Sequence, residues 1–259
     1  MSTTQYMTKW ITQFGFPLLL ALGLGACAGS FGFDSTSWQE EVLLHDGSKI
    51  IVTRTVERGG RHEIGQEPPI KEQRLSFMLP GTNENVTWED KLTEDIGGAH
   101  FLPMPLEIRQ GTAYLVVYPM GCLSYNKWGR PNPFYVIFKY QARTWQRITL
   151  QELPGEFKTP NLIFSSPDRE AEKRGRIVSA EAIRSLYDGY KQPEFKTILR
   201  EAMGNAGGRC GEMVYDGKGG WIGTGWFRKQ PSYEACLKYC EQEKMSAQYC
   251  PCETLFKGK

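Results

Sequence analysis

The chain has 259 residues, and its 31 Lys and Arg residues nearly balance 29 Asp and Glu residues, for a formal net charge of +2. A charge this close to zero argues against a protein that binds nucleic acid or acidic surfaces through a basic face. The length suits one sizeable domain, or one domain with a small appendage. Its 28 glycines and 15 prolines favour a β protein with many turns.

An apolar segment lies close to the amino end of the chain. It runs from Phe14 to Ala26 (FGFPLLLALGLGA) and is shorter than the roughly 20 residues that span a bilayer. It has the length of the apolar part of a signal peptide and ends in small residues directly before Cys27. The four residues Leu24-Gly25-Ala26-Cys27 resemble the lipobox of bacterial prolipoproteins.

The resemblance implies that residues 1–26 are a signal peptide removed before Cys27. The Cys27 sulfur would carry diacylglycerol, and the new amino group would carry an acyl chain such as palmitate. Several acyl chains together anchor a protein firmly, since each buried methylene contributes ~0.8 kcal/mol. Ala28 is not the Asp that retains such proteins in the inner membrane of many Gram-negative bacteria. The resemblance therefore implies the outer membrane, with the domain facing the periplasm or the cell surface. The alternative is an N-terminal core helix with a buried cysteine.

The chain after Cys27 contains an even number of cysteines, which in an exported protein predicts disulfides. These are Cys122, Cys210, Cys236, Cys240, Cys250 and Cys252. The first two of the last four share one face of a predicted helix, and Cys-Pro-Cys cannot close on itself without strain. Each pair should therefore bond the other, most simply as Cys236–Cys252 and Cys240–Cys250, which leaves Cys122–Cys210. The alternative is a four-thiolate zinc site, which an oxidising envelope disfavours, so we expect neither a metal nor a cofactor.

Short β-prone runs joined by turns fill the segment from residue 38 to 165. The predicted strands are Trp38–Leu44, Lys49–Val56, Glu72–Leu79, Asn85–Asp90, Leu102–Ile108, Ala113–Tyr118, Phe134–Tyr140 and Thr144–Leu150. Asp46-Gly47 is a strong hairpin signal, because Gly tolerates the positive φ of the turn. The spacing predicts an antiparallel β domain, either a sandwich or a propeller-like meander. Residues 27–37 would tether it to the membrane.

Two stretches of this domain resemble uncharacterised lipoproteins and hypothetical proteins of Gram-negative bacteria. One is the opening that begins at Trp38, and the other is Lys127–Pro133 (KWGRPNP). The resemblance covers residues 38 to about 165 and implies no particular activity.

Residues 166–259 are expected to form an α-rich, Cys-rich C-terminal region. The predicted helices are Ala180–Tyr190 after a Ser179 cap, Glu194–Met203 after Pro193, and a last one from Ser232 to about Glu243. Gly204–Gly225 is rich in glycine and predicts a loop with room for one hairpin.

Four aromatic residues beside glycines and prolines are the strongest candidates for binding: Tyr125, Trp128, Trp221 and Trp226. Such rings can stack on sugars or on a partner protein, although packing at sheet edges is the alternative.

The catalytic signals are weaker. Glu89-Asp90 and Glu94-Asp95 flank Lys91 and offer an acid/base pair for sugar cleavage, with a solvated surface as the simpler interpretation. No Gly-x-Ser-x-Gly elbow is present. The three histidines are not at metal spacing and are expected on the surface: His45, His62 and His100.

The sequence thus favours a non-catalytic envelope lipoprotein that presents a disulfide-stapled, mainly β domain to an envelope protein or a glycan. The alternative is an envelope hydrolase acting on a glycan or peptidoglycan, with Glu89 or Asp90 as acid or base. A protein that blocks a toxin or an enzyme at the cell surface is a third hypothesis.

Overall fold

The computed structural model describes residues 34–60, 62–204 and 210–258. The predicted signal peptide, the lipidation site Cys27 and the first part of the predicted tether lie outside these ranges. Within the described ranges, no helix combines the length and the apolar character needed to cross a membrane.

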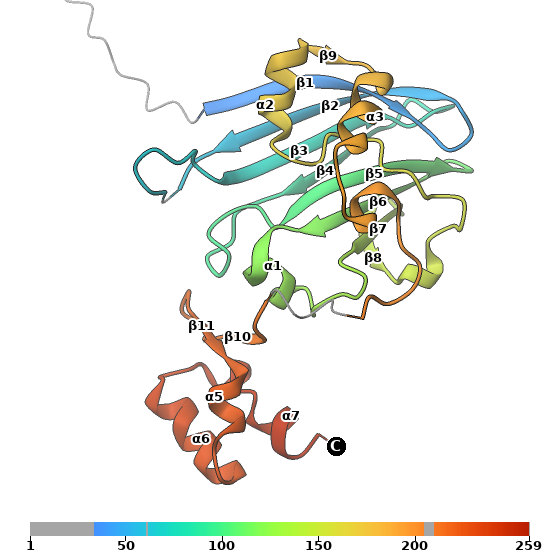
Figure 1. The fold of residues 1–259 in the computed structure, drawn as a ribbon. Coiled ribbons are helices and arrows are strands. Elements are labelled where there is room, and N and C mark those ends of the chain that lie inside the picture. Colours follow the sequence, from blue (N-terminus) through green and yellow to red (C-terminus); the bar gives the residue numbers. More distant parts are fainter. Residues whose placement is uncertain (1–33, 61, 205–209, 259) are drawn as a thin grey trace, which may run out of the picture. The chain divides into compact units, whose positions relative to one another are not determined.

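Two sheets form the main body of the chain (Figure 1). The first consists of β1 (Asp34–Leu43), β2 (Lys49–Arg58), β3 (Ile70–Met78), β4 (Asn85–Asp90) and β9 (Ile177–Val178). Its order is β4-β3-β2-β1-β9, antiparallel except that β9 runs parallel to β1. The second is an antiparallel meander of β5 (Phe101–Arg109), β6 (Thr112–Pro119), β7 (Val136–Gln141) and β8 (Thr144–Ile148).

The burial pattern explains why the two sheets pack. In β2, Val52, Arg54 and Val56 are buried while the residues between them face solvent, which is the period-two pattern of a sheet with one covered face. In β6, by contrast, consecutive residues from Leu115 to Val117 are all buried, so both faces of the second sheet are covered.

The first core lies between the two sheets. Its members from the first sheet are Val42, Val52, Leu75, Phe77, Val86 and Trp88, and those from the second are Phe101, Leu106, Ile108, Ala113, Leu115, Val117, Val136 and Phe138. Two antiparallel sheets that share one core form a sandwich, so the prediction of a mainly β fold is confirmed.

The second core covers the other face of the second sheet and one end of the first. Val116 and Ile137 meet Trp38 and Val56 there. Three helices contribute to its cover, α2 (Pro167–Arg174), α3 (Ala180–Asp188) and α4 (Pro193–Lys196), together with loop residues such as Phe157 and Ile163. Residues 167–198, which were expected to belong with the Cys-rich region, therefore pack as part of the β domain.

Several boundaries differ from those expected. The tether was predicted to extend to residue 37, but β1 begins at Asp34, because Ser35, Thr36 and Ser37 pair with the end of β2. The helix predicted after Pro193 ends at Lys196, where Ile198 N instead donates to Lys158 O at 2.8 Å. Helix α1 (Gly121–Lys127) lies in a stretch for which no helix was predicted.

A small module, residues 210–258, follows the β domain. It contains a hairpin of β10 (Met213–Tyr215) and β11 (Trp221–Gly223) and the helices α5 (Thr224–Arg228), α6 (Tyr233–Gln242) and α7 (Cys252–Phe256). Its buried hydrophobic residues are Phe227, Cys236, Cys240 and Cys252. A short 3-10 turn at Ala247–Tyr249 also belongs to the module, and another, at Leu150–Glu152, follows β8 in the β domain.

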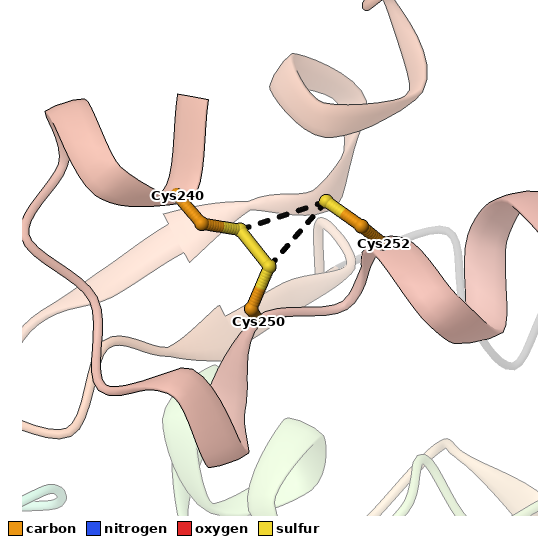
Figure 2. Close-up of side chains that lie close together, drawn as sticks. All are labelled: Cys240, Cys250 and Cys252. Atoms are coloured by element: carbon orange, nitrogen blue, oxygen red, sulfur yellow. Dashed lines mark hydrogen bonds between the residues drawn. A yellow bond between two sulfur atoms is a disulfide. The ribbon is translucent and has the colours of Figure 1, made fainter. Parts of the chain in front are cut away.

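The three predicted disulfides are confirmed: Cys122–Cys210, Cys236–Cys252 and Cys240–Cys250. The first joins α1 of the β domain to the start of the Cys-rich module. In the module, the Cys252 sulfur lies 3.6 Å from that of Cys240 and 3.4 Å from that of Cys250 (Figure 2). The two bonds of the module are thus adjacent, and they staple α6 to the chain around α7.

Candidate functional site: an aromatic cleft

A cleft of about 730 Å³ lies where the Cys-rich module meets the β domain. We call it the aromatic cleft. Its lining from the β domain comprises Glu94, Asp95, Asn126 and Lys127. Its lining from the module includes Glu212, Met213, Val214, Tyr215, Trp221, Thr224, Gln248, Tyr249, Pro251, Thr254 and Leu255.

Three aromatic rings form one wall of the cleft. The ring centroid of Tyr215 lies 5.7 Å from that of Trp221 and 5.0 Å from that of Tyr249. All three rings keep part of their surface exposed to solvent. Adjacent, partly exposed rings of this kind provide an apolar platform with polar tips.

The turn between β10 and β11 brings this wall together. Gly217 has a φ of +84°, and a Cβ there would lie 2.5 Å from Ser246 Oγ and 2.8 Å from Tyr249 Cδ2. Only glycine allows both this backbone conformation and this close approach. This turn lies within the Gly204–Gly225 stretch, for which a loop with room for one hairpin was predicted.

The β domain holds the wall in place through direct hydrogen bonds. Trp221 Nε1 donates to Asp95 O at 2.7 Å. Met213 N donates to Asn126 Oδ1 at 3.0 Å. Together with the Cys122–Cys210 disulfide, these bonds tie both strands of the module's hairpin to the β domain.

An ion pair forms the polar side of the cleft. Lys127 Nζ lies 2.8 Å from Asp95 Oδ1, and Thr93 Oγ1 donates to the same oxygen at 2.5 Å. Burial alone would raise the pKa of Asp95, but the hydrogen bonds from Lys127 and Thr93 together lower it below its ordinary value. Asp95 is therefore a fixed anion with its charge compensated.

The buried His100 is connected to the Lys127–Asp95 ion pair through Thr93. His100 Nε2 lies 2.7 Å from Thr93 Oγ1, and Trp128 Nε1 donates to His100 Nδ1 at 3.2 Å. Because an indole N–H can only donate, Nδ1 must accept and Nε2 must carry the proton. Burial also lowers the pKa of His100 to about 4. The imidazole therefore donates to Thr93 and cannot act as a base that activates its hydroxyl, so this cluster positions groups and is not a nucleophilic triad.

The four aromatic residues expected to bind occupy different environments. Trp221 lines the aromatic cleft, and Trp226 is 58% exposed outside its lining. Tyr125 is 3% exposed and packs against Phe134. It is therefore a core residue whose ring is not available to a ligand. Trp128 is partly buried and lies 4.7 Å from the ring of Phe101. The sequence did not point to Tyr215 and Tyr249, because their partner Trp221 and the turn at Gly217 are close to them only in the fold.

The carboxylates of the predicted acid/base pair point away from each other. Successive residues of a strand face opposite sides of a sheet. Glu89 lies on the solvent face of β4 and pairs with Lys91 at 2.8 Å. Asp90 is 5% exposed and accepts the backbone N–H groups of His100 and Phe101. Burial raises the pKa of Asp90 to about 6, but no substrate can meet both carboxylates.

One of the three histidines differs from the expected surface position. His45 and His62 are exposed residues, as predicted, whereas His100 is 6% exposed. The rings of His45 and His100 both make polar contacts with residues distant in sequence.

Comparisons of the chain with protein-family models, curated proteins and solved structures give no match. The function proposed below therefore relies on the sequence and on the geometry of the aromatic cleft.

Proposed function

We propose that this chain is a lipid-anchored protein of the bacterial cell envelope, attached to the outer membrane through Cys27, that binds a glycan in the aromatic cleft without cleaving it. The single observation that carries the binding function is the cleft itself. It combines three neighbouring rings with carboxylate, amide and ammonium groups at one site.

The lipid anchor is supported by the Leu24-Gly25-Ala26-Cys27 sequence. Three disulfides support export, since such bonds persist in oxidising compartments such as the periplasm. Peptidoglycan and surface polysaccharides are the polymers that such a protein meets there.

The chemistry of the cleft favours a glycan over other ligands. The faces of the rings of Trp221, Tyr215 and Tyr249 can stack on the C–H faces of sugars. Glu94, Glu212 and Gln248 offer acceptors and donors for sugar hydroxyls. The volume of the cleft lies within the usual range of about 300 to 1,000 Å³ for ligand pockets. Lys127 is compensated by Asp95, which disfavours a polyanion.

The binding function is tested with a soluble form that starts at Ala28 and with muramidase-digested peptidoglycan. Titration calorimetry should detect binding to the wild type, and Trp221→Ala should weaken it at least fivefold, since truncating an aromatic anchor costs about 1 kcal/mol or more. Trp226→Ala is the matched control, because Trp226 is exposed outside the cleft. Equal binding by both variants would reject the cleft as the site.

The anchor is tested in cells by comparing the wild type with Cys27→Ser. Mass spectrometry should find a triacylated N-terminal peptide beginning at Cys27, and fractionation should place the wild type with the outer membrane. An unmodified N-terminal peptide from a membrane fraction would disprove the lipidation proposal and leave the cleft unaffected.

A further inference from the structure

A second pocket, of about 340 Å³, lies on the β domain and shares no lining residue with the aromatic cleft. We call it the His45 pocket. The residues that matter for its chemistry are His45, Glu107, Glu156, Lys158, Asn161 and Arg184. They come from the β1–β2 turn, from β5, from the loop before α2, and from α3.

A buried carboxylate holds the imidazole of His45. Glu107 Oε2 lies 2.9 Å from His45 Nδ1 and accepts the backbone N–H of the same residue, also at 2.9 Å. The other oxygen, Oε1, accepts Asn161 Nδ2 at 3.3 Å. The Glu107 side chain is 4% exposed. With Nδ1 committed to a carboxylate, Nδ1 carries a proton and Nε2 is the ring nitrogen left for a ligand.

Packing against Phe157 also fixes the orientation of the His45 ring. The ring of Phe157, which is fully buried, contacts it edge to face with centroids 4.8 Å apart. In the part of the chain that the structure describes, Nε2 has no hydrogen-bond partner. Burial raises the pKa of Glu107, so a desolvated carboxylate is retained here to orient one imidazole.

The charges at the mouth of the pocket do not balance. Glu156 is neutralised by Arg109, whose Nε lies 3.2 Å from its Oε1. Lys158 and Arg184 are both exposed, and neither forms an ion pair among the described residues. Lys158 and Arg184 are therefore two cations of the pocket lining that have no carboxylate partner.

We propose that the His45 pocket binds a phosphate group, which is held by Nε2 of His45, the ammonium of Lys158 and the guanidinium of Arg184. A guanidinium can bind two phosphate oxygens at once, and an ammonium binds them as a point charge. The pocket also has room for the group that carries the phosphate. The phosphate can belong to a soluble ester or to a lipid headgroup, since both present the same oxygens.

The test is nuclear magnetic resonance of the soluble chain labelled on its histidine nitrogens. Addition of inorganic phosphate should shift the His45 ring signals in a saturable way and leave those of His62 and His100 unchanged. The double variant Lys158→Gln/Arg184→Gln should weaken phosphate binding at least tenfold. A control with the same charge change, Arg143→Gln/Lys191→Gln, alters exposed residues outside the pocket and should bind as the wild type does.

Glycerol 3-phosphate and vesicles of phosphatidylcholine with phosphatidic acid distinguish the two sources. Binding of the soluble ester alone supports a soluble ligand, and tighter co-sedimentation with the vesicles that depends on Lys158 and Arg184 supports a lipid headgroup. Saturable phosphate binding that is equal in the pocket double variant and the control, or no shift of His45 in excess phosphate, would overturn the proposal. Trp221→Ala should leave phosphate binding intact, so failure here and failure of the glycan-binding function are separate outcomes.

Discussion

Arg54 and Glu40 form an ion pair that is removed almost completely from solvent. Arg54 Nη1 lies 3.0 Å from Glu40 Oε1, and their side chains are 1% and 0% exposed. Glu40 Oε2 accepts Ile163 N at 2.9 Å, and Arg54 Nη1 donates to Ile163 O at 2.6 Å. The pair therefore joins β1 and β2 to the segment that leads into α2.

Removing one partner of this pair should be strongly destabilising. Arg54→Met leaves the Glu40 carboxylate buried without its counter-ion, which costs about 3 to 5 kcal/mol. Urea denaturation followed by fluorescence measures this free energy of unfolding. The double variant Glu40→Leu/Arg54→Met removes both charges and should recover at least half of the loss. Equal losses in the single and double variants would mean that packing, not the unpaired charge, dominates.

Asp90 and His100 should act on stability in opposite directions as the pH changes. Burial raises the pKa of Asp90 from 3.8 to about 6, so the folded state binds this proton more tightly. That contribution is full below pH ~4 and is lost as the pH rises through about 6. Burial lowers the pKa of His100 from 6.5 to about 4. Its contribution is full above pH ~6.5 and is lost as the pH falls toward 4.

Each single variant should expose the opposing effect. As the pH rises from ~4 to 6 and Asp90 ionises, the free energy of unfolding of His100→Gln should fall by on the order of 2 kcal/mol. In the wild type, the opposite contribution of His100 offsets this fall. Asp90→Asn should gain stability with pH over the same range. Urea titrations at several pH values measure both slopes. The backbone N–H of His100 that binds Asp90 is kept in the His100 variant. Parallel pH profiles for the two variants would contradict the assignment.

The Cys-rich module should depend on its own disulfides far more than the β domain does. Only four of its described hydrophobic side chains are buried, and three of these are disulfide cysteines. A core of this size rarely suffices without such bonds. Cys236→Ser/Cys252→Ser opens a bond that spans 16 residues and should cost roughly 3 kcal/mol.

Hydrogen exchange with mass spectrometry locates that loss. Exchange should become fast in residues 224–256 and stay slow in β2 and β6. In the control Cys122→Ser/Cys210→Ser, residues 224–256 should stay protected, because both internal bonds of the module remain. Protection lost throughout the chain in the first variant would mean that the module and the β domain unfold together.

The local features of the fold were predictable from the sequence because each depends on neighbouring residues. Asp46-Gly47 correctly marks the β1–β2 hairpin, and Ser179 caps α3 by accepting Ala182 N. The disulfide pairing follows from helical spacing and from the strain of a Cys-Pro-Cys closure. Helix α1 was missed because Gly121–Lys127 has no side-chain cap at its start.

The sites could not be predicted because their residues meet only in the fold. Glu107 is 62 residues from His45, and Asp95 is 126 residues from Trp221. Tyr125 carried the same aromatic signal as Trp221, yet one ring is buried in a core and the other lines the cleft. Sequence spacing does not distinguish these two outcomes.

Gly217 and Gly219 provide a direct test of how the β10–β11 turn builds the aromatic cleft. Both have a positive φ, of +84° and +93°, so alanine at either position carries a backbone strain of about 1 to 2 kcal/mol. A Cβ at Gly217 would also overlap Ser246 and Tyr249, whereas at Gly219 the nearest atom, Glu94 Oε1, is 3.8 Å away. Gly217→Ala should therefore displace Tyr249 and weaken peptidoglycan-fragment binding severalfold beyond any effect of Gly219→Ala. Calorimetric titration of the two variants measures this difference, and indistinguishable affinities would show that Tyr249 takes no part in binding.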